Sequence, residues 1–495
     1  MNYQSTRNDA CIVSAAEAIL HGLALDGGLY TMRTLTQLNF NWKETLKKDT
    51  FGMAVDILTA LLPDFGREEM TALVEAAYSG KFESDDLTPS VPLGDDTVLE
   101  LFRGPTSAFK DVALSMLPHL ITAAKEKCGV SDEILILTAT SGDTGKAAME
   151  GFRDVDGTKI IVFYPHGGVS AVQQAQMCTQ EGSNVCVAAV EGNFDDAQTG
   201  VKKIFAAVNE GELLIGKGVR LSSANSINIG RLAPQVVYYF RAYADLLAKG
   251  VIRLGERVDF SVPTGNFGDI LAGWFAKEMG LPVGRLICAS NANDVLTEFI
   301  NTGRYDRRRE FYKTISPSMD ILVSSNLERL LYLMSGDAQL VKKLMDELSE
   351  NGSYEIPEEL HRRLSTEFWA GCCNDTATKG AIRQIWNEFH YLADTHTAVA
   401  WNVAQQYKAF TGSQRPVVIL STASPYKFPA AVLEALGEDA QGDEFSVMEQ
   451  LNRLTGVPVP KNLEGLKEKQ VRHSTILGKN ELLSFVLGKA GERGW

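Results

Sequence analysis

The sequence predicts an α/β fold, because short apolar runs alternate with longer amphipathic segments along most of the chain. Six of the short runs are rich in β-branched residues, apolar on both faces, and bounded by Gly, Pro or Ser. This alternation is typical of parallel sheets whose two faces are covered by helices, with right-handed crossovers between strands. A chain of 495 residues is too long for a single hydrophobic core, so we expect several domains or subdomains.

Residues 1–92 are expected to form a mostly helical N-terminal domain. Apolar residues recur at helical spacing in Val13–Leu23, Met53–Leu62 and Glu68–Tyr78. The stretch Phe82–Asp96 contains two prolines and a glycine, and we interpret it as the connection to the next domain.

Residues 93–440 carry the alternating segments and are expected to form the catalytic α/β domain. The expected strands are Ile134–Thr138, Lys159–Tyr164, Val185–Val190, Asp259–Val262, Arg285–Ala289 and Val417–Leu420. The expected helices between them are Val169–Glu181, Asp195–Val208, Arg231–Leu247 and Ile270–Met279. The first three strands predict a smaller subdomain at about 125–225, and the later strands predict the main sheet.

Two further regions break this alternation. Residues 304–391 are charged and helical in pattern, and we interpret them as a helical insertion. Residues 441–495 form a charged, partly helical C-terminal extension without any motif that indicates chemistry.

The composition excludes several classes of protein. A formal net charge of −14 argues against nucleic acid and anionic membranes as partners, and no apolar run approaches the ~20 residues that span a bilayer. The start, MNYQSTRNDA, lacks the pattern of a secretory signal. The seven cysteines have no Cys-x-x-Cys spacing, which favours reduced thiols in the cytoplasm. No histidine or cysteine pattern predicts a metal site.

Lys110 is the strongest catalytic candidate. It lies in Gly104-Pro-Thr-Ser-Ala-Phe-Lys-Asp111, after small residues and an aromatic side chain. A lysine withdrawn from water has a lowered pKa and can condense with an aldehyde.

A glycine-rich turn at 265–269 is a candidate binding site for a phosphate group. It follows an expected strand and precedes an expected helix, so its backbone N–H groups and the positive helix end can bind a phosphate. Its Gly-x-x-Gly spacing is not that of a dinucleotide-binding fingerprint. The turn consists of Gly265, Asn266, Phe267, Gly268 and Asp269.

Two other segments offer donors for anions. Ser141-Gly142-Asp143-Thr144-Gly145 follows an expected strand, lacks the glycine and the Ser/Thr of a nucleotide P-loop, and can bind a carboxylate. In residues 223–231, Asn225, Ser226 and Asn228 are ordinary helix-capping types, while the Arg231 guanidinium can pair bidentately with a phosphate.

These motifs, in this order, resemble the threonine synthase family of fold type II pyridoxal-phosphate enzymes. Residues 3–7, 22–30, 164–170 and 421–428 are also similar to family blocks, so the resemblance spans about residues 3 to 430. It implies that Lys110 forms the Schiff base and that Gly265–Asp269 holds the cofactor phosphate. It also implies that Thr422 meets the pyridine nitrogen, and that Ser141, Gly142, Asp143 and Thr144 bind the substrate carboxylate. Asn225, Ser226, Asn228 and Arg231 would contact the substrate. Lys427 is a second candidate for the substrate phosphate, although a surface position is the commoner expectation for such a lysine, and His396 receives no catalytic role.

The resemblance implies conversion of O-phospho-L-homoserine and water to L-threonine and phosphate. We expect a cytoplasmic protein, and the sequence leaves open whether it is a monomer or a homodimer. Three alternatives stay open: a phospholyase that releases 2-oxobutyrate, a hydroxy-amino-acid dehydratase, and a catalytically silent cofactor-binding homologue.

Overall fold

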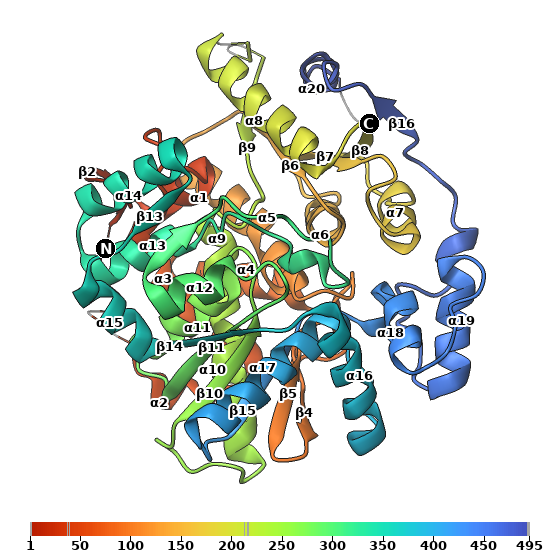
Figure 1. Cartoon of the computed structure of the whole chain (residues 1–495). Coiled ribbons are helices and arrows are strands. Elements are labelled where there is room, and N and C mark those ends of the chain that lie inside the picture. Colours follow the sequence, from red (N-terminus) through yellow and green to blue (C-terminus); the bar gives the residue numbers. More distant parts are fainter. Residues whose placement is uncertain (1, 37, 39, 212, 215–216, 493–495) are drawn as a thin grey trace.

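The computed structural model of the chain describes residues 2–36, 38, 40–211, 213–214 and 217–492. Two largely parallel sheets form its framework, each with helices on both faces (Figure 1). The predicted α/β class with two parallel-sheet subdomains is therefore confirmed. Among the described residues, we find no helix with the length and apolar character needed to cross a membrane.

The larger sheet has six strands in the order β14-β11-β10-β15-β5-β4, of which only β4 is antiparallel to its neighbour. Its strands are β4 Ser90–Leu93, β5 Asp96–Glu100, β10 Val258–Pro263, β11 Val283–Ser290, β14 Phe368–Cys372 and β15 Val417–Ser421. Strand β4 lies within Phe82–Asp96, which the sequence predicted as a connection only. Its antiparallel hairpin with β5 forms one edge of this sheet.

The smaller sheet is parallel throughout, in the order β16-β8-β7-β6-β9. Its strands are β6 Glu133–Ala139, β7 Thr158–Pro165, β8 Val185–Val190, β9 Val219–Ser222 and β16 Thr475–Leu477. Strand β16 comes from the C-terminal extension, which therefore completes this sheet instead of lying outside it (Figure 1).

Alternating side chains of both sheets are buried on opposite faces, which accounts for strand runs that are apolar throughout. On the larger sheet, Ile287 and Ile419 pack on the side of α17, whereas Leu286 and Val418 belong to the core on the side of α10 and α11. On the smaller sheet, α8 and α20 cover one face, and α5 and α6 cover the other. The helices of this part are α5 Lys110–Lys127, α6 Asp143–Phe152, α7 Ala171–Cys178, α8 Phe194–Glu210, α9 Ile229–Leu232, α10 Val236–Ala248, α11 Gly268–Glu278, α12 Val295–Thr302, α17 Thr395–Thr411 and α20 Leu482–Ala490, with the 3-10 turn η1 Ala233–Gln235.

The N-terminal region contains the expected helices and also a small antiparallel sheet that the sequence did not predict. Its helices are α1 Ala15–His21, α2 Trp42–Thr45, α3 Thr50–Leu61 and α4 Arg67–Tyr78, and its strands are β1 Tyr3–Ser5, β2 Asn8–Val13 and β3 Tyr30–Met32. Two of these strands have only three residues, too few for an alternating pattern to be recognised.

Residues 304–391 are mostly helical but are not separate from the catalytic framework. Their elements are β12 Arg304–Asp306, η2 Pro317–Met319, α13 Leu327–Ser335, α14 Ala338–Asn351, β13 Ser353–Glu355, α15 Glu358–Glu367, β14 and α16 Asp375–Phe389. Strand β14 forms the other edge of the larger sheet. The last part of the chain adds η3 Pro425–Lys427, α18 Pro429–Ala435, α19 Glu444–Thr455 and η4 Leu466–Glu468 before β16 and α20.

Candidate active site

Lys110 is the first residue of α5 and is only 9% exposed. The loop before it contains Ser107 in the left-handed region, with φ 59°. This loop is attached to the segment after β15, because the Phe109 N–H donates to the Thr422 carbonyl at 2.8 Å and the Ser424 N–H donates to the Ser107 carbonyl at 3.1 Å. The segment that follows β15 of the larger sheet therefore fixes the loop that precedes Lys110.

The ammonium group of Lys110 is surrounded by both signs of charge. Its Nζ lies 3.9 Å from Asp143 Oδ2 and 4.9 Å from the centre of the Phe109 ring. Burial lowers the pKa of Lys110 to about 8; Asp143 opposes this shift, whereas the positive charges of Lys427 and Arg231 add to it. A large fraction of the amine is therefore neutral at mildly alkaline pH, which suits a nucleophile or a base.

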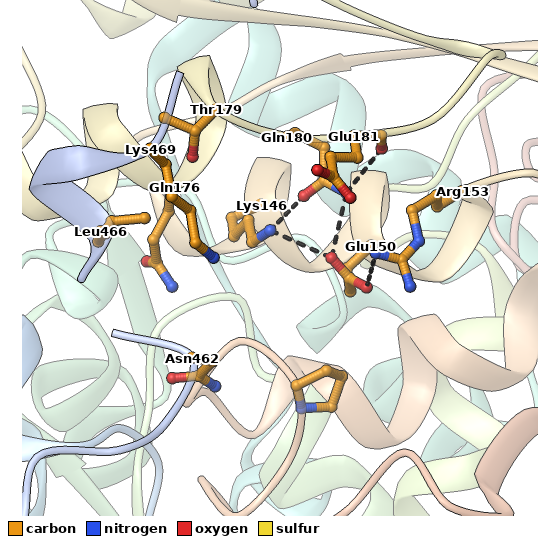
Figure 2. A pocket seen from close by; sticks show the side chains of 11 residues that line it. Lys146, Glu150, Arg153, Gln176, Thr179, Gln180, Glu181, Asn462, Leu466 and Lys469 are labelled. Carbon is orange, nitrogen blue, oxygen red and sulfur yellow. Dashed lines mark hydrogen bonds and ion pairs between the residues drawn. The ribbon is translucent and has the colours of Figure 1, made fainter. Parts of the chain in front are cut away.

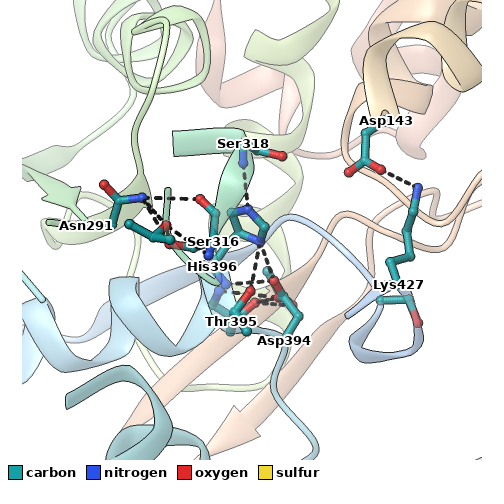
Figure 3. A network of polar contacts seen from close by, with 12 residues as sticks. Asp143, Asn291, Ser316, Ser318, Asp394, Thr395, His396 and Lys427 are labelled. Atoms are coloured by element: carbon teal, nitrogen blue, oxygen red, sulfur yellow. Dashed lines mark hydrogen bonds and ion pairs between the residues drawn. The ribbon is translucent and has the colours of Figure 1, made fainter. Parts of the chain in front are cut away.

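Asp143 faces two lysine ammonium groups and one side-chain amide. Its Oδ1 pairs with Lys427 Nζ at 2.6 Å (Figure 3). The same oxygen accepts a hydrogen bond from Gln173 Nε2 at 2.9 Å. Burial disfavours the ionised carboxyl, but Lys427 and Lys110 outweigh it and hold the pKa of Asp143 well below its usual range. Lys427 is fully buried and also donates to the Thr106 carbonyl at 3.1 Å, so the expectation of a surface lysine was wrong.

The small-residue turn that ends β6 is shaped by Thr140. Its Oγ1 accepts hydrogen bonds from the N–H groups of Gly142 at 3.0 Å and Gly145 at 2.9 Å. Gly142 has φ 137°, and a Cβ there would collide with the Gln173 amide. The hydroxyls of Ser141 and Thr144 make no hydrogen bond within the described part of the chain, so both are free to meet a ligand.

Arg231 is the last residue of the segment 223–231 and is 3% exposed. Its Nη1 donates to the Ala224 carbonyl at 2.9 Å, but its Nε has no partner, and no carboxylate among the described residues pairs with it. Burial lowers the pKa of Arg231 to about 10. A buried guanidinium without a counter-ion is well suited to receive an anionic ligand.

The amide residues of the same motif have different surroundings. Asn228 caps α9 through a hydrogen bond from the Gly230 N–H at 2.9 Å, and its Nδ2 donates to the Ile19 and Ser223 carbonyls. Its amide is thus engaged inside the protein, whereas Asn225 and Ser226 are half-buried.

The turn between β10 and α11 has the geometry of an anion site. Phe267 adopts φ 61°, and α11 begins at Gly268, so the first helical N–H groups lack intrahelical acceptors. A Cβ at Gly265 would lie 2.7 Å from the Ser318 carbonyl, which shows how closely η2 packs against this turn. Asn266 accepts hydrogen bonds through its carbonyl from the Asn326 N–H at 3.1 Å and Nδ2 at 3.0 Å.

Asp269 is the second residue of α11 and turns its carboxyl toward two tyrosines. Oδ1 accepts hydrogen bonds from Tyr238 at 2.5 Å and Tyr239 at 3.0 Å, while Oδ2 has no partner among the described residues. Burial raises the pKa of Asp269 to about 6, and the charge of Lys110 opposes that rise. Asp269 and Lys110 therefore act on each other electrostatically.

Thr422 follows β15 directly and is buried beside the lysine loop. Its carbonyl accepts the Phe109 N–H, and its hydroxyl makes no hydrogen bond in the described part of the chain. The hydroxyl is thus free for a polar group of a ligand.

Two supporting residues were not found by sequence reasoning. Asn326 joins two motifs, because its Nδ2 donates to both the Ser226 and the Asn266 carbonyls. Asn462, in the C-terminal extension, accepts from the Ser107 hydroxyl at 2.8 Å and donates to the Gly104 carbonyl at 3.1 Å. Both are single amides outside any motif, so the sequence carries no signal for them.

His396, to which the sequence analysis gave no catalytic role, also supports the site and is 1% exposed. Its Nδ1 lies 2.9 Å from Asp394 Oδ1, and its Nε2 accepts the Ser318 N–H at 3.2 Å (Figure 3). Because Nε2 accepts from a backbone amide, the proton of the neutral ring is on Nδ1. His396 therefore fixes η2, which in turn packs against Gly265.

Comparisons with known proteins show the family to which the chain belongs. Models of the threonine synthase N terminus and of the threonine synthase C-terminal region match residues 2–78 and 397–482. Threonine synthase from Pseudomonas aeruginosa is 39% identical, covering 88% of this chain and 90% of that protein. Human threonine synthase-like 1 is 41% identical to this chain. The match covers 85% of this chain but only 58% of the length of the human protein.

Solved structures give the same result. A pyridoxal-phosphate-bound threonine synthase from Brucella melitensis superposes with a TM-score of 0.87 at 37% identity, covering 99% of this chain and all of that one. The yeast threonine synthase structure has the same TM-score at 32% identity, covering 99% of this chain and 98% of that one. The fold and the buried lysine thus define a fold type II enzyme. The chain belongs to the threonine synthase family.

Proposed function

We propose that the chain is a pyridoxal-phosphate-dependent threonine synthase, which converts O-phospho-L-homoserine and water to L-threonine and inorganic phosphate. The observation that carries this proposal is a buried lysine with a lowered pKa, Lys110, next to the buried guanidinium of Arg231, which has no carboxylate partner in the described chain. Lys110 would bind an aldehyde cofactor, and Arg231 would bind an anionic group of the substrate.

The residues fit pyridoxal phosphate on three sides. Lys110 meets the aldehyde, and the turn formed by Gly265, Asn266, Phe267, Gly268 and Asp269 receives the phosphate at the start of α11. The Thr422 hydroxyl would form a hydrogen bond with the pyridine nitrogen. Because this hydroxyl is neutral, the nitrogen would not be fully protonated. When bound, the cofactor supplies an electron sink for the charge that is left on carbon after a proton is removed.

The protein's own groups would supply binding and proton transfer. Neutral Lys110 removes and returns protons at the substrate's Cα and Cβ. The turn formed by Ser141, Gly142, Asp143 and Thr144 holds the substrate carboxylate, and the charge of Asp143 is compensated by Lys427. Arg231, with Asn225 and Ser226, holds the substrate phosphate. We assign Asn228 a positioning role, since its amide is bound inside the protein.

The test is to mix the holoenzyme with O-phospho-L-homoserine and to measure phosphate, threonine and 2-oxobutyrate together. We expect phosphate and threonine in nearly equal amounts. Arg231→Ala should lower turnover strongly, because it removes a charged donor from a desolvated site. The matched control is Arg241→Ala, whose side chain pairs with Asp86 and Asp245 elsewhere.

The competing activity is a phospholyase that releases phosphate and 2-oxobutyrate. The phospholyase remains an alternative because four of the matching relatives, at 38–41% identity, are named threonine synthase-like 1. That name does not state an activity. If 2-oxobutyrate equals the released phosphate and threonine is absent, the phospholyase replaces the synthase.

For location and assembly, the proposal is a cytoplasmic monomer or homodimer that acts on a small molecule. The seven cysteines are free thiols in the structure, which is compatible with a reducing compartment. Sedimentation of the purified protein would decide between monomer and dimer.

A further inference from the structure

A polar cavity of about 240 Å³ lies beside the lysine loop, between α6, α7 and the C-terminal extension (Figure 2). Pro105 of the lysine loop and Asn462 line one side of it. On the other side, Figure 2 shows Lys146, Gln176 and Lys469 extending into the same space from three separate segments. None of the sequence motifs or the proposed reaction uses this cavity.

The charges around the cavity leave one positive charge in excess. Its charged lining residues are Lys146, Arg153 and Lys469, which are positive, and Glu150 and Glu181, which are negative. Glu150 pairs with Lys146 at 3.1 Å and with Arg153 at 3.2 Å, whereas Lys469 forms no ion pair with any residue that the structure describes. Burial lowers the pKa of Lys146, and its paired Glu150 carboxylate opposes that shift; the positive charge of Lys469 acts in the same direction as burial, so the two ammonium groups repel each other. An anion between them would relieve that repulsion.

A buried acceptor lies next to these cations. Gln176 is 1% exposed, and its Nε2 donates to the Thr106 carbonyl at 3.4 Å. Its Oε1 has no partner among the described residues. A buried amide oxygen without a donor is rare in folded proteins, so a ligand with a hydrogen-bond donor fits here.

We propose that this cavity binds a small phosphate-type anion that carries a hydroxyl group. Lys469 and Lys146 meet its charge, and its hydroxyl donates to Gln176 Oε1. The bound anion would join α6 and α7 to the C-terminal extension, whose Asn462 holds the loop that precedes Lys110. The site is thus separate from the reacting lysine but in contact with its support.

The experiment is calorimetric titration of inorganic phosphate into the holoenzyme at pH 6, with sulfate in parallel. We expect a phosphate site that Lys469→Ala weakens about tenfold or more, as expected for the loss of a charged partner. Lys467→Ala is the matched control, because Lys467 is exposed and pairs with Asp443 outside the cavity. Unchanged phosphate binding in Lys469→Ala would overturn the proposal.

Sulfate tests the role of the hydroxyl, because sulfate carries no proton at this pH. Although sulfate carries the larger charge at this pH, we expect it to bind more weakly than phosphate in the wild type. Gln176→Met, which removes the acceptor at similar size, should abolish this preference for phosphate. Equal binding in the wild type would refute the assignment of Gln176. Methyl phosphate, about half of which keeps one proton at pH 6, distinguishes the source: tighter binding than inorganic phosphate indicates a phosphorylated metabolite.

Discussion

Lys427 and Asp143 form an ion pair almost completely withdrawn from water, 2.6 Å apart, within reach of the reactive lysine. If this turn binds the substrate carboxylate, as we propose, the Asp143 carboxylate would repel that ligand unless a cation compensated it. Lys427 supplies that cation from the opposite subdomain. Asp143 therefore lies beside Lys110 without leaving an uncompensated negative charge in the turn.

The lowered pKa of Lys110 predicts how cofactor uptake depends on pH. The neutral amine is the reactive form, and it is lost as the pH falls through its folded pKa of about 8, below the ordinary value of 10.5. We expect covalent uptake of pyridoxal phosphate by the apoenzyme to rise with pH, with a midpoint near 8. The measurement is the absorbance change together with borohydride trapping on Lys110; a midpoint near 10.5 would contradict it.

Lys427→Met should move that midpoint to higher pH, because the charge of Lys427 lowers the pKa of Lys110. The variant also leaves Asp143 buried without its closest partner, which typically costs about 3–5 kcal/mol of stability. Lys427→Arg keeps the charge and serves as the control. An unchanged midpoint in a folded Lys427→Met protein would show that the two lysines are not coupled.

Gly265 and Gly268 lie in the turn that we propose binds the cofactor phosphate. Substitutions at these two glycines allow effects on folding to be separated from effects on cofactor binding. A Cβ at Gly268 would meet nothing closer than Asn326 Nδ2 at 3.4 Å, an ordinary contact, whereas a Cβ at Gly265 would strike the Ser318 carbonyl at 2.7 Å. We expect Gly268→Ala to fold normally but to bind pyridoxal phosphate about tenfold more weakly, about 1.4 kcal/mol. Gly265→Ala should destabilise the apoenzyme as well. Wild-type affinity in Gly268→Ala, measured by fluorescence titration, would place the phosphate elsewhere.

At the scale of elements, the segment between α19 and β16 is in direct contact with the catalytic loop. Asn462 bonds both to the hydroxyl of Ser107, which has the unusual positive φ, and to the carbonyl of Gly104. A loop in this conformation needs support from its surroundings. The C-terminal extension provides part of that support.

Asn462→Ala should therefore lower kcat about tenfold while the protein stays folded, because the lysine is positioned less accurately. Asn452→Ala is the matched control: it removes a hydrogen bond to the Val457 carbonyl within the same extension but leaves the lysine loop untouched. Turnover and circular dichroism of both variants check the prediction. Equal activity of the two variants would show that Asn462 has no special role.

The sequence predicted elements where periodicity is strong. Strands β6, β7, β8, β10, β11 and β15 lie within a few residues of their expected positions, because a short continuous apolar run between turn residues is typical of a buried strand. The predicted helix at 231–247 is divided at Pro234 into α9, η1 and α10. Strands β14 and β16 were missed, since one lies among helices and the other has three residues.

For the site, sequence reasoning found the groups that lie in motifs and missed those that act through single long-range contacts. The charges of Asp143 and Arg231, which come from two separate motifs, both act on Lys110. Burial of Lys427 could not be predicted, because a lone lysine near Pro425 gives no sign of its partner across the site. His396 was identified by resemblance, but its contact with Ser318 depends on tertiary packing.

At the scale of the whole molecule, the site joins the two sheets. Asp143 follows β6 of the smaller sheet, while Lys427 and Thr422 follow β15 of the larger one. We therefore expect pyridoxal phosphate to raise the melting temperature of the entire chain, with about 2.7 kcal/mol of stabilisation at a free concentration of 100 Kd. Pyridoxal, without the phosphate, should stabilise less at equal concentration. Equal shifts in differential scanning calorimetry would argue against the α11 turn as the phosphate site.

The pairing of β16 with β8 has a consequence for how the protein is made. Thr475–Leu477 pairs with residues 188–190, nearly three hundred positions earlier. Until synthesis has passed residue 477, β8 presents an open edge that other strands could occupy. Contacts between such distant segments form slowly, because the intervening chain must first be brought into order. A nascent chain that is released early would therefore contain both motif turns of the active site and still expose an unpaired strand, which makes it a substrate for chaperones.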